Sequence, residues 1–236
     1  MWGVGGCWGG GGDGGGVGEG GREGERERER ERERERFLWA ADLVRGTYLP
    51  AGHVPPPELR SLLSVARLVA FAKPQGGVRP IAMGSCLRRA VAAAVCLQLR
   101  PAFLRVLQPV QFGVGVRAAA EQMSVAVRLL LSEHPDWVVI TTDAANAFNS
   151  VSRRAVVDAL RRHFPSLLPF VEIFYAVDGD LVIRMPWGIE FVRSRCGVQQ
   201  GDPLGPLLFA LALQETLMQV QATAFGDAQG ARVLAY

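Results

Sequence analysis

The first 36 residues follow a pattern that gives a compact fold nothing to bury. Residues 1–24 are mostly glycine, and residues 25–36 alternate Glu and Arg without exception. In a helix, positions four apart would carry like charges and positions three apart opposite ones, so the two effects partly cancel. Because no apolar face exists, residues 1–36 are predicted to be a disordered tail. The tail is either an RNA-binding or interaction segment or, as we favour, the translation of a simple nucleotide repeat.

Residues 37–236 are therefore predicted to form the globular part. The tail contributes −2 to the total charge of +3, which leaves the globular part at +5. Mild basicity is compatible with a phosphate-rich partner without requiring one. The four cysteines form no C-x-x-C pair, which argues against a zinc site and a disulfide framework. No segment is typical of a secretory signal or a membrane span, so an intracellular protein without a membrane partner is expected.

Apolar periodicity and turn residues predict an irregular mixture of helices and strands. Helices are predicted at 55–69, 86–107, 117–134, 152–164 and 203–221, and the second is expected to bend or break before Pro101. Hairpins are predicted at 68–83 and 180–195, with turns at 74–77 and 186–188, and single strands at 136–143 and 232–236. The β-branched composition of the 136–143 strand predicts burial on both of its faces. The irregular order of these elements favours the α+β class.

Two residues near the end of the 136–143 strand are candidates for chemistry. Asp143 is the last residue of the strand, where a carboxylate is held on a rigid element and can still bind a metal ion. An aspartate that only caps a turn is the more common case for such a residue taken alone. Phe148 follows five residues later, and it either lines a pocket or packs in the core.

The passage G-V-Q-Q-G-D-P-L-G-P-L-L at 197–208 precedes a long apolar helix. Asp202 and Pro203 are typical of a helix start, as an acidic N-cap and a proline at the first helical position. Capping does not account for Gln199, Gln200 and Gly201. A glutamine beside a glycine lets a ligand approach the backbone closely and accept or donate a hydrogen bond, and a nucleotide would suit.

A third candidate is the pair of cations on either side of the turn at 74–77. Lys73 and Arg79 would both lie on this hairpin, where two cations can hold a triphosphate. Taken alone, two solvated surface charges are the simpler interpretation.

The order of these motifs is more informative than any one of them. R-P-I at 79–81 is followed by Q-F-G at 111–113, D-x-x-x-A-F-N at 143–149 and Q-G-D-P-L-G-P at 200–206. This series resembles the reverse transcriptases, which are RNA-directed DNA polymerases, and it is most similar to those of non-LTR retrotransposons. The resemblance extends over residues 62–236.

The resemblance implies a partial right-hand polymerase fold, with the fingers and part of the palm, in which an antiparallel palm sheet packs on helices. It implies that Asp143 is catalytic, that Asp143 and the carbonyl of Ala144 bind two Mg²⁺ ions, and that Phe148 is the steric gate that selects deoxynucleotides. The residues it implies for nucleotide binding are Lys73, Arg79, Ala144, Phe148, Gln200 and Gly201. The implied partners are an RNA template, a DNA primer and a dNTP, and copying into a genome would require access to the nucleus.

A two-metal site needs more acid than Asp143 supplies, because two Mg²⁺ ions bring four positive charges. The resemblance implies a pair of adjacent aspartates directly after an aromatic residue that Tyr236 resembles. The sequence as given is therefore expected to be a C-terminally truncated fragment that is inactive alone. Asp178 and Asp180 are predicted to be turn residues and not replacements for the missing pair.

Two alternatives remain open at the level of the sequence. One is a non-catalytic nucleic-acid-binding protein, which would bind RNA in a salt-sensitive way without a metal ion. The other is an RNA-copying RNA polymerase, which Phe148 disfavours because a bulky gate excludes ribonucleotides.

Overall fold

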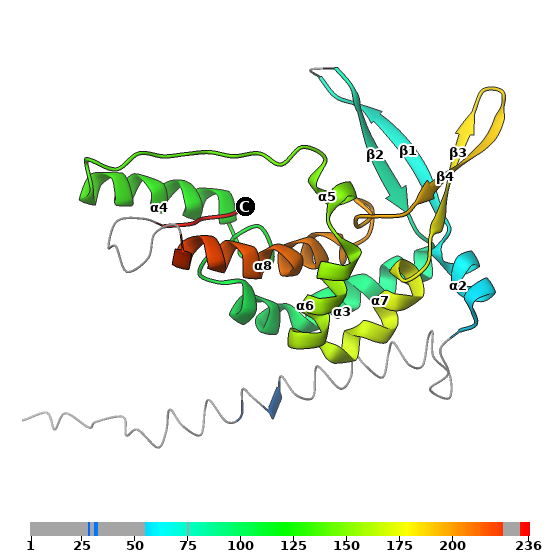
Figure 1. Cartoon of the computed structure of the whole chain (residues 1–236), viewed down its shortest axis with the longest axis horizontal. Coiled ribbons are helices and arrows are strands. Elements are labelled where there is room, and N and C mark those ends of the chain that lie inside the picture. The colour runs from blue at the N-terminus through cyan, green and yellow to red at the C-terminus, as the bar shows by residue number, and fades with distance from the viewer. Residues whose placement is uncertain (1–27, 29–30, 33–54, 75, 224–231) are drawn as a thin grey trace, which may run out of the picture.

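The computed structural model describes residues 28, 31–32, 55–74, 76–223 and 232–236. Most of the predicted tail and the predicted boundary at residue 37 lie outside these residues. The described part has a body of packed helices from which a four-stranded sheet projects (Figure 1). The α+β class predicted from the sequence is confirmed.

Four helices build the body, and their apolar sides meet in one core. The helices are α3 (Cys86–Leu107), α6 (Arg153–His163), α7 (Leu168–Tyr175), which follows the 3₁₀ turn η2 (Pro165–Leu167), and α8 (Gly205–Thr223). The Ser85 hydroxyl caps α3 and the Ser152 hydroxyl caps α6, the second as predicted. Pro101 lies inside α3, which continues as one helix to Leu107, so the break expected before this proline does not occur.

The helix α3 is also long and apolar enough to cross a membrane by length and composition. In this structure, however, one of its faces lies in the core, and Arg88 on that face is buried in an ion pair. A core helix of a globular domain passes the same test of length and composition.

The sheet consists of two hairpins that share a narrow base. Its strands are β1 (Ala66–Ala72), β2 (Val78–Met83), β3 (Gly179–Met185) and β4 (Gly188–Ser194), in the order β2-β1-β3-β4. Both hairpins are antiparallel and turn where predicted. They are joined by two parallel residue pairs, Ala66–Leu181 and Arg67–Val182, and they splay apart beyond this base (Figure 1). The sheet is therefore mixed, and not wholly antiparallel as the resemblance implied.

The predicted helix at 55–69 is wrong in its second half. The helix α2 (Pro57–Ser64) ends before residue 66, where β1 begins. Residues 66–69 continue the helical apolar pattern, but their backbone pairs with β2 along the whole strand. Tertiary pairing thus overrides a weak local preference for helix.

The predicted strand at 136–143 is also wrong. After α4 (Ala119–Glu133), residues 137–144 adopt no regular structure, and Val138 and Ile140 are 82% and 83% exposed. A strand needs a neighbour to satisfy its backbone, and no described strand lies beside this segment, which crosses above α4 and α8 toward α5 (Ala147–Ser150; Figure 1). Residues 232–236 form a single parallel bridge, between Ala235 and Gln111.

Candidate functional site

The loop from Gly197 to Leu204 joins β4 to α8 and docks on the short helix α5. The Gly197 N–H donates to the Val151 carbonyl at 3.0 Å, and the Val198 N–H donates to the Phe148 carbonyl at 2.7 Å. Gly197 has φ +72°, and a Cβ there would lie 2.4 Å from the carbonyl carbon of Asn149. Only glycine fits this approach. The docking brings the A-F-N and Q-G-D-P motifs together.

The same loop touches the base of β2. A Cβ on Gly201 would lie 2.2 Å from the Ala82 carbonyl oxygen and 3.3 Å from the Ile81 side chain. The R-P-I motif therefore meets the Q-G pair at this contact. The Q-F-G motif is anchored on α8, because the Gln111 amide donates to the Ala210 carbonyl at 2.8 Å and to the Gln214 side chain at 2.7 Å.

Phe148 is partly buried against the core, so its packing role is confirmed, while the pocket-lining role stays a prediction. Its half-buried ring stacks on Phe209 of α8, with ring centroids 4.9 Å apart and planes 15° apart. Stacking on a core aromatic fixes the ring in place.

The structure does not bring every predicted site residue to this point. Asp143 and Ala144 lie on the exposed irregular segment before α5. Lys73 and Arg79 are exposed on the outer half of the β1–β2 hairpin. Arg79 is three residues from Ala82, which corresponds to about 10 Å along the strand. Within the described residues, no three His, Cys, Asp or Glu side chains group as metal ligands.

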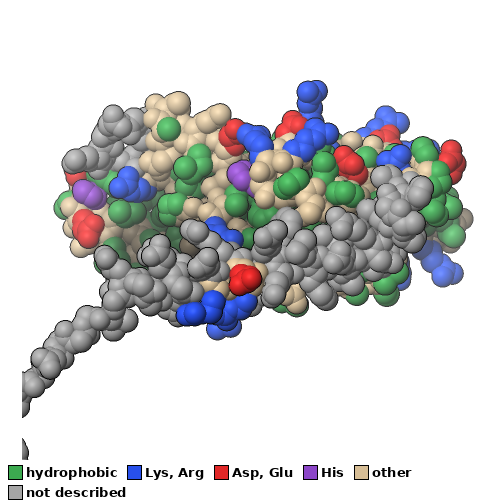
Figure 2. Space-filling view, turned by 90° about the horizontal axis from the view of Figure 1, so that it is seen from below, with side chains coloured by type: hydrophobic (Ala, Val, Ile, Leu, Met, Phe, Trp, Pro, Cys, Tyr) green, Lys and Arg blue, Asp and Glu red, His purple; other side chains and the backbone are tan. Residues whose placement is uncertain are grey.

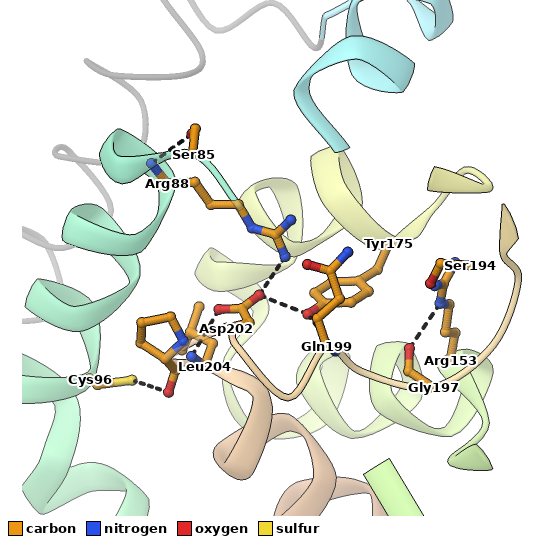
Figure 3. Close-up of polar contacts among 11 residues, drawn as sticks. Ser85, Arg88, Cys96, Arg153, Tyr175, Ser194, Gly197, Gln199, Asp202 and Leu204 are labelled. Carbon is orange, nitrogen blue, oxygen red and sulfur yellow. Dashed lines mark hydrogen bonds and ion pairs between the residues drawn. The ribbon is translucent and has the colours of Figure 1, made fainter. Parts of the chain in front are cut away.

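A buried polar cluster holds the loop from behind (Figure 3). The Asp202 carboxylate accepts from the Tyr175 hydroxyl at 2.7 Å, from the Arg88 guanidinium at 2.5 Å and from the Leu204 N–H at 3.0 Å. Arg88 is 1% exposed. The sequence predicts Asp202 only as the N-cap of a helix with Pro203 at its first position. That prediction is wrong in register, because α8 begins at Gly205 and Asp202 instead caps the turn before it.

Tyr175 connects the carboxylate to the glutamine pair. Its hydroxyl accepts from the Gln199 N–H at 3.2 Å while it donates to Asp202. Burial, reinforced by the negative charge of Asp202, raises the pKa of Tyr175 above its usual range, so the hydroxyl remains a donor. The side-chain oxygens of Gln199 and Gln200 are buried without a hydrogen-bond partner among the described residues. Buried acceptors of this kind call for a donor from elsewhere.

Arg153 fixes the other end of the loop. Its guanidinium donates to the Gly197 carbonyl at 3.0 Å and to the Ser194 hydroxyl at 2.8 Å, and it lies 5.4 Å from the centre of the Tyr175 ring. Burial lowers the pKa of Arg153, and the negative charge of Asp178 partly opposes this shift. The loop is thus held from α3, α6 and α7 together.

These geometric findings agree with comparisons to known proteins. Residues 71–236 match the sequence profile of the reverse transcriptase (RNA-dependent DNA polymerase) family, which is well over half of the chain. The chain belongs to the reverse transcriptase family. The resemblance to this family inferred from the motif order is therefore confirmed. Reverse transcriptases bind nucleic-acid templates and primers and generally use divalent metal ions.

Relatives of this reverse transcriptase come from non-LTR retrotransposons. It is 27% identical over 175 residues to the retrotransposable element SLACS 132 kDa protein of Trypanosoma brucei gambiense, covering 73% of this chain and 14% of that protein. It is 28% identical over 167 residues to the Pol polyprotein of the type-2 element R2DM of Drosophila melanogaster, covering 68% and 15%. The chain thus spans about a seventh of the length of these two relatives.

Among solved structures, the reverse transcriptase chain is similar to a chain of the partial Cas6-RT-Cas1–Cas2 complex. That similarity has a TM-score of 0.39 and 18% sequence identity, and it covers 80% of this chain and 30% of the other.

The cluster makes a prediction about pH. The Cys96 thiol donates to the Pro203 carbonyl at 3.5 Å, and burial, with a smaller contribution from Asp202, raises its pKa from 9.0 to about 12. The thiol ionises near pH 9 in the unfolded chain and near pH 12 in the folded chain. The stability is therefore fully present below pH 9 and is lost as the pH rises toward 12. At pH 10.5 the loss is about 2 kcal/mol. Thermal melts at pH 8 and 10.5 should show a smaller alkaline decrease for Cys96→Ala than for the unchanged chain. An equal decrease would contradict the prediction, and Cys86→Ala, which changes an exposed thiol, is the control.

Proposed function

We propose that this chain forms the fingers and part of the palm of an RNA-directed DNA polymerase, and that the Gly197–Leu204 loop is one wall of its dNTP site. The observation that carries the proposal is the meeting of α5, the loop and the base of β2, three segments far apart in the sequence. Two of these contacts are possible only at glycine, so the backbone of the loop lies directly against α5 and β2.

In this proposal, Gln200 and Gly201 contact the incoming nucleotide and Phe148 is the gate beside its sugar. The buried and unpartnered oxygen of Gln200 would accept a hydrogen bond from the nucleotide. Lys73 and Arg79 would hold the triphosphate from the hairpin above. They suit this role because strand alternation places both on one side of the hairpin, the side on which Ile81 touches Gly201.

The metal ions would be held by the Asp143 carboxylate and the Ala144 carbonyl. Both are oxygen ligands of the kind that Mg²⁺ prefers, and both are exposed. When bound, two Mg²⁺ ions activate the primer hydroxyl and neutralise charge on the leaving phosphate. One carboxylate cannot balance two such ions, so the proposal requires further carboxylates that the described residues do not place near Asp143.

The test is primer extension with dNTPs and Mg²⁺. The 236-residue chain is expected to incorporate no nucleotide above background, because its described residues group no further ligands into a metal site. Extension that Asp143→Ala abolishes would refute this part of the proposal.

The gate is tested in a longer chain that is active in primer extension. Phe148→Ala should reduce the preference for deoxynucleotides over ribonucleotides by about 10- to 200-fold, which is the discrimination that steric contacts supply. Ser150→Ala, at an exposed neighbouring position, is the control. Unchanged selectivity in an active Phe148→Ala enzyme would exclude Phe148 as the gate.

A further inference from the structure

The part of the loop that carries Gln200 and Gly201 is a turn closed by its own backbone. The Asp202 N–H donates to the Gln199 carbonyl at 3.1 Å. Residues 199–202 therefore form a four-residue turn with Gln200 and Gly201 at its centre. The backbone bond fixes the shape of this turn, whereas its orientation depends on groups outside it.

One phenolic hydroxyl contacts both ends of the turn. The Tyr175 hydroxyl accepts from the Gln199 N–H at 3.2 Å and donates to the Asp202 carboxylate at 2.7 Å (Figure 3). A hydroxyl has a single proton, so it can satisfy both ends only by donating to one and accepting from the other. Because the oxygen of Tyr175 belongs to α7 and not to the loop, its position sets where the centre of the turn points.

Two guanidinium groups hold the ring that carries this hydroxyl. Arg88 of α3 lies 5.3 Å from the centre of the Tyr175 ring, and Arg153 of α6 lies 5.4 Å from it. Figure 3 shows the two arginines on different sides of Tyr175. The ring is 6% exposed, and the attraction between a cation and an aromatic face is strongest where water is excluded. The hydroxyl is therefore fixed in place from two helices besides its own.

The cations at Tyr175 differ from those on the surface. On the side of the molecule seen from below, acidic and basic side chains are interspersed with apolar ones (Figure 2). Exposed charges of this kind order their neighbours weakly because water and salt screen them. Arg88 is buried and Arg153 is half-buried, so their hold on the ring is screened much less.

Filling the core does not by itself require a tyrosine at this position. The preceding residue of α7, Phe174, is also buried, lies 4.2 Å from Arg88 and packs edge-on against Phe170. A phenylalanine at position 175 would keep the ring and both cation contacts. The additional hydroxyl costs desolvation unless its hydrogen bonds are made, and the bonds it makes are those to the turn.

We propose that Tyr175 is a positioning residue for nucleotide binding, because its hydroxyl fixes the orientation of Gln200 and Gly201. Tyr175 touches no substrate itself and acts through the turn. The effect on nucleotide binding rests on the proposed function, whereas the hold on the turn does not. The two are therefore measured separately.

The first measurement is amide hydrogen exchange by NMR in the full 236-residue chain. Tyr175→Phe removes the acceptor of the Gln199 N–H. Exchange of this amide should become about fivefold faster relative to the Val156 amide of α6, the effect of losing one typical hydrogen bond. Ile173→Val, a change in a buried side chain of the same helix, lowers stability without touching the hydroxyl and should leave the ratio unchanged. An unchanged ratio in Tyr175→Phe would overturn the proposal.

The second measurement is steady-state kinetics with dNTPs, in a longer chain that is active in primer extension. Tyr175→Phe should raise the KM for dNTP about 2- to 10-fold and change kcat little, the pattern of lost binding that is shared by ground and transition states. Ile173→Val should leave KM unchanged, which separates positioning from a general loss of stability. If Gln200→Ala raises KM and Tyr175→Phe does not, the positioning role is refuted while the proposed function stands.

A double variant identifies the residue through which Tyr175 acts. With Gln200→Ala already present, Tyr175→Phe should raise KM by less than it does alone, because the side chain that it orients is gone. Full additivity of the two effects would overturn the positioning role. If neither single variant changes KM, the loop is not a wall of the dNTP site, and the proposed function fails together with the role of Tyr175.

Discussion

Replacement of Asp202 by alanine is expected to destabilise the protein by about 3–5 kcal/mol, the cost of breaking a buried ion pair from one side. The substitution leaves the Arg88 guanidinium buried without its carboxylate and removes the acceptor of the Tyr175 hydroxyl. For a chain of this size, the melting temperature should fall by about 10 °C. Differential scanning calorimetry near pH 7 measures this directly.

Two further variants separate the ion pair from its surroundings. Asp180→Ala removes the carboxylate of the more exposed pair with Arg193 and should change the melting temperature little. Arg88→Met combined with Asp202→Leu removes both buried charges and should recover much of the lost stability. If Asp202→Ala has the same melting temperature as Asp180→Ala, the buried cluster does not hold the loop.

Gly197→Ala is expected to cost about 2–5 kcal/mol, because the new methyl group meets the backbone of α5 and the residue must keep a left-handed conformation. The Cβ would lie 2.4 Å from the Asn149 carbonyl carbon, a distance that only movement of the loop or of α5 can relieve. Urea unfolding should show a lower midpoint with an unchanged slope.

Gly76→Ala supplies the matched control for this variant. Gly76 has φ +89°, similar to the +72° of Gly197, but a Cβ there would meet nothing within 4 Å. The cost of Gly76→Ala therefore measures the left-handed conformation alone, about 1–2 kcal/mol. Equal costs at the two glycines would show that the loop does not press on α5.

The elements that the sequence predicts correctly are those fixed by local signals. Both hairpins turn at their Gly and Pro residues, and Ser152 caps α6 as expected. The 136–143 segment has the composition of a strand, but composition does not supply a partner, and residues 137–144 remain irregular. Of the candidate site, the sequence supplies the motifs of the loop and of α5, while their contact depends on tertiary docking at Gly197.

The cations that hold the loop, buried Arg88 and half-buried Arg153, are the residues that sequence reasoning missed, although a signal for them exists. Arg88 is spaced three and seven residues before Val91 and Val95, which are buried on the same stripe of α3. Arg153 precedes Val156 and Leu160 in the same way on α6, whereas its neighbour Arg154 has a side chain that is 92% exposed. A cation on an apolar helical stripe indicates a buried partner. The partner itself, Asp202, lies too far along the chain for such a pattern to identify.

The narrow base of the sheet has a consequence for how the molecule comes apart. Two residue pairs join the hairpins, while the Gly197–Leu204 loop is held by buried contacts to several helices. Segments with few buried contacts open at lower free energy than the core that carries them. The outer parts of the hairpins, beyond the contact of Ala82 with Gly201, are therefore expected to open at lower free energy than the helical body. The Gly197–Leu204 loop belongs to the helical body, so a change in the loop is expected to alter the stability of the whole fold.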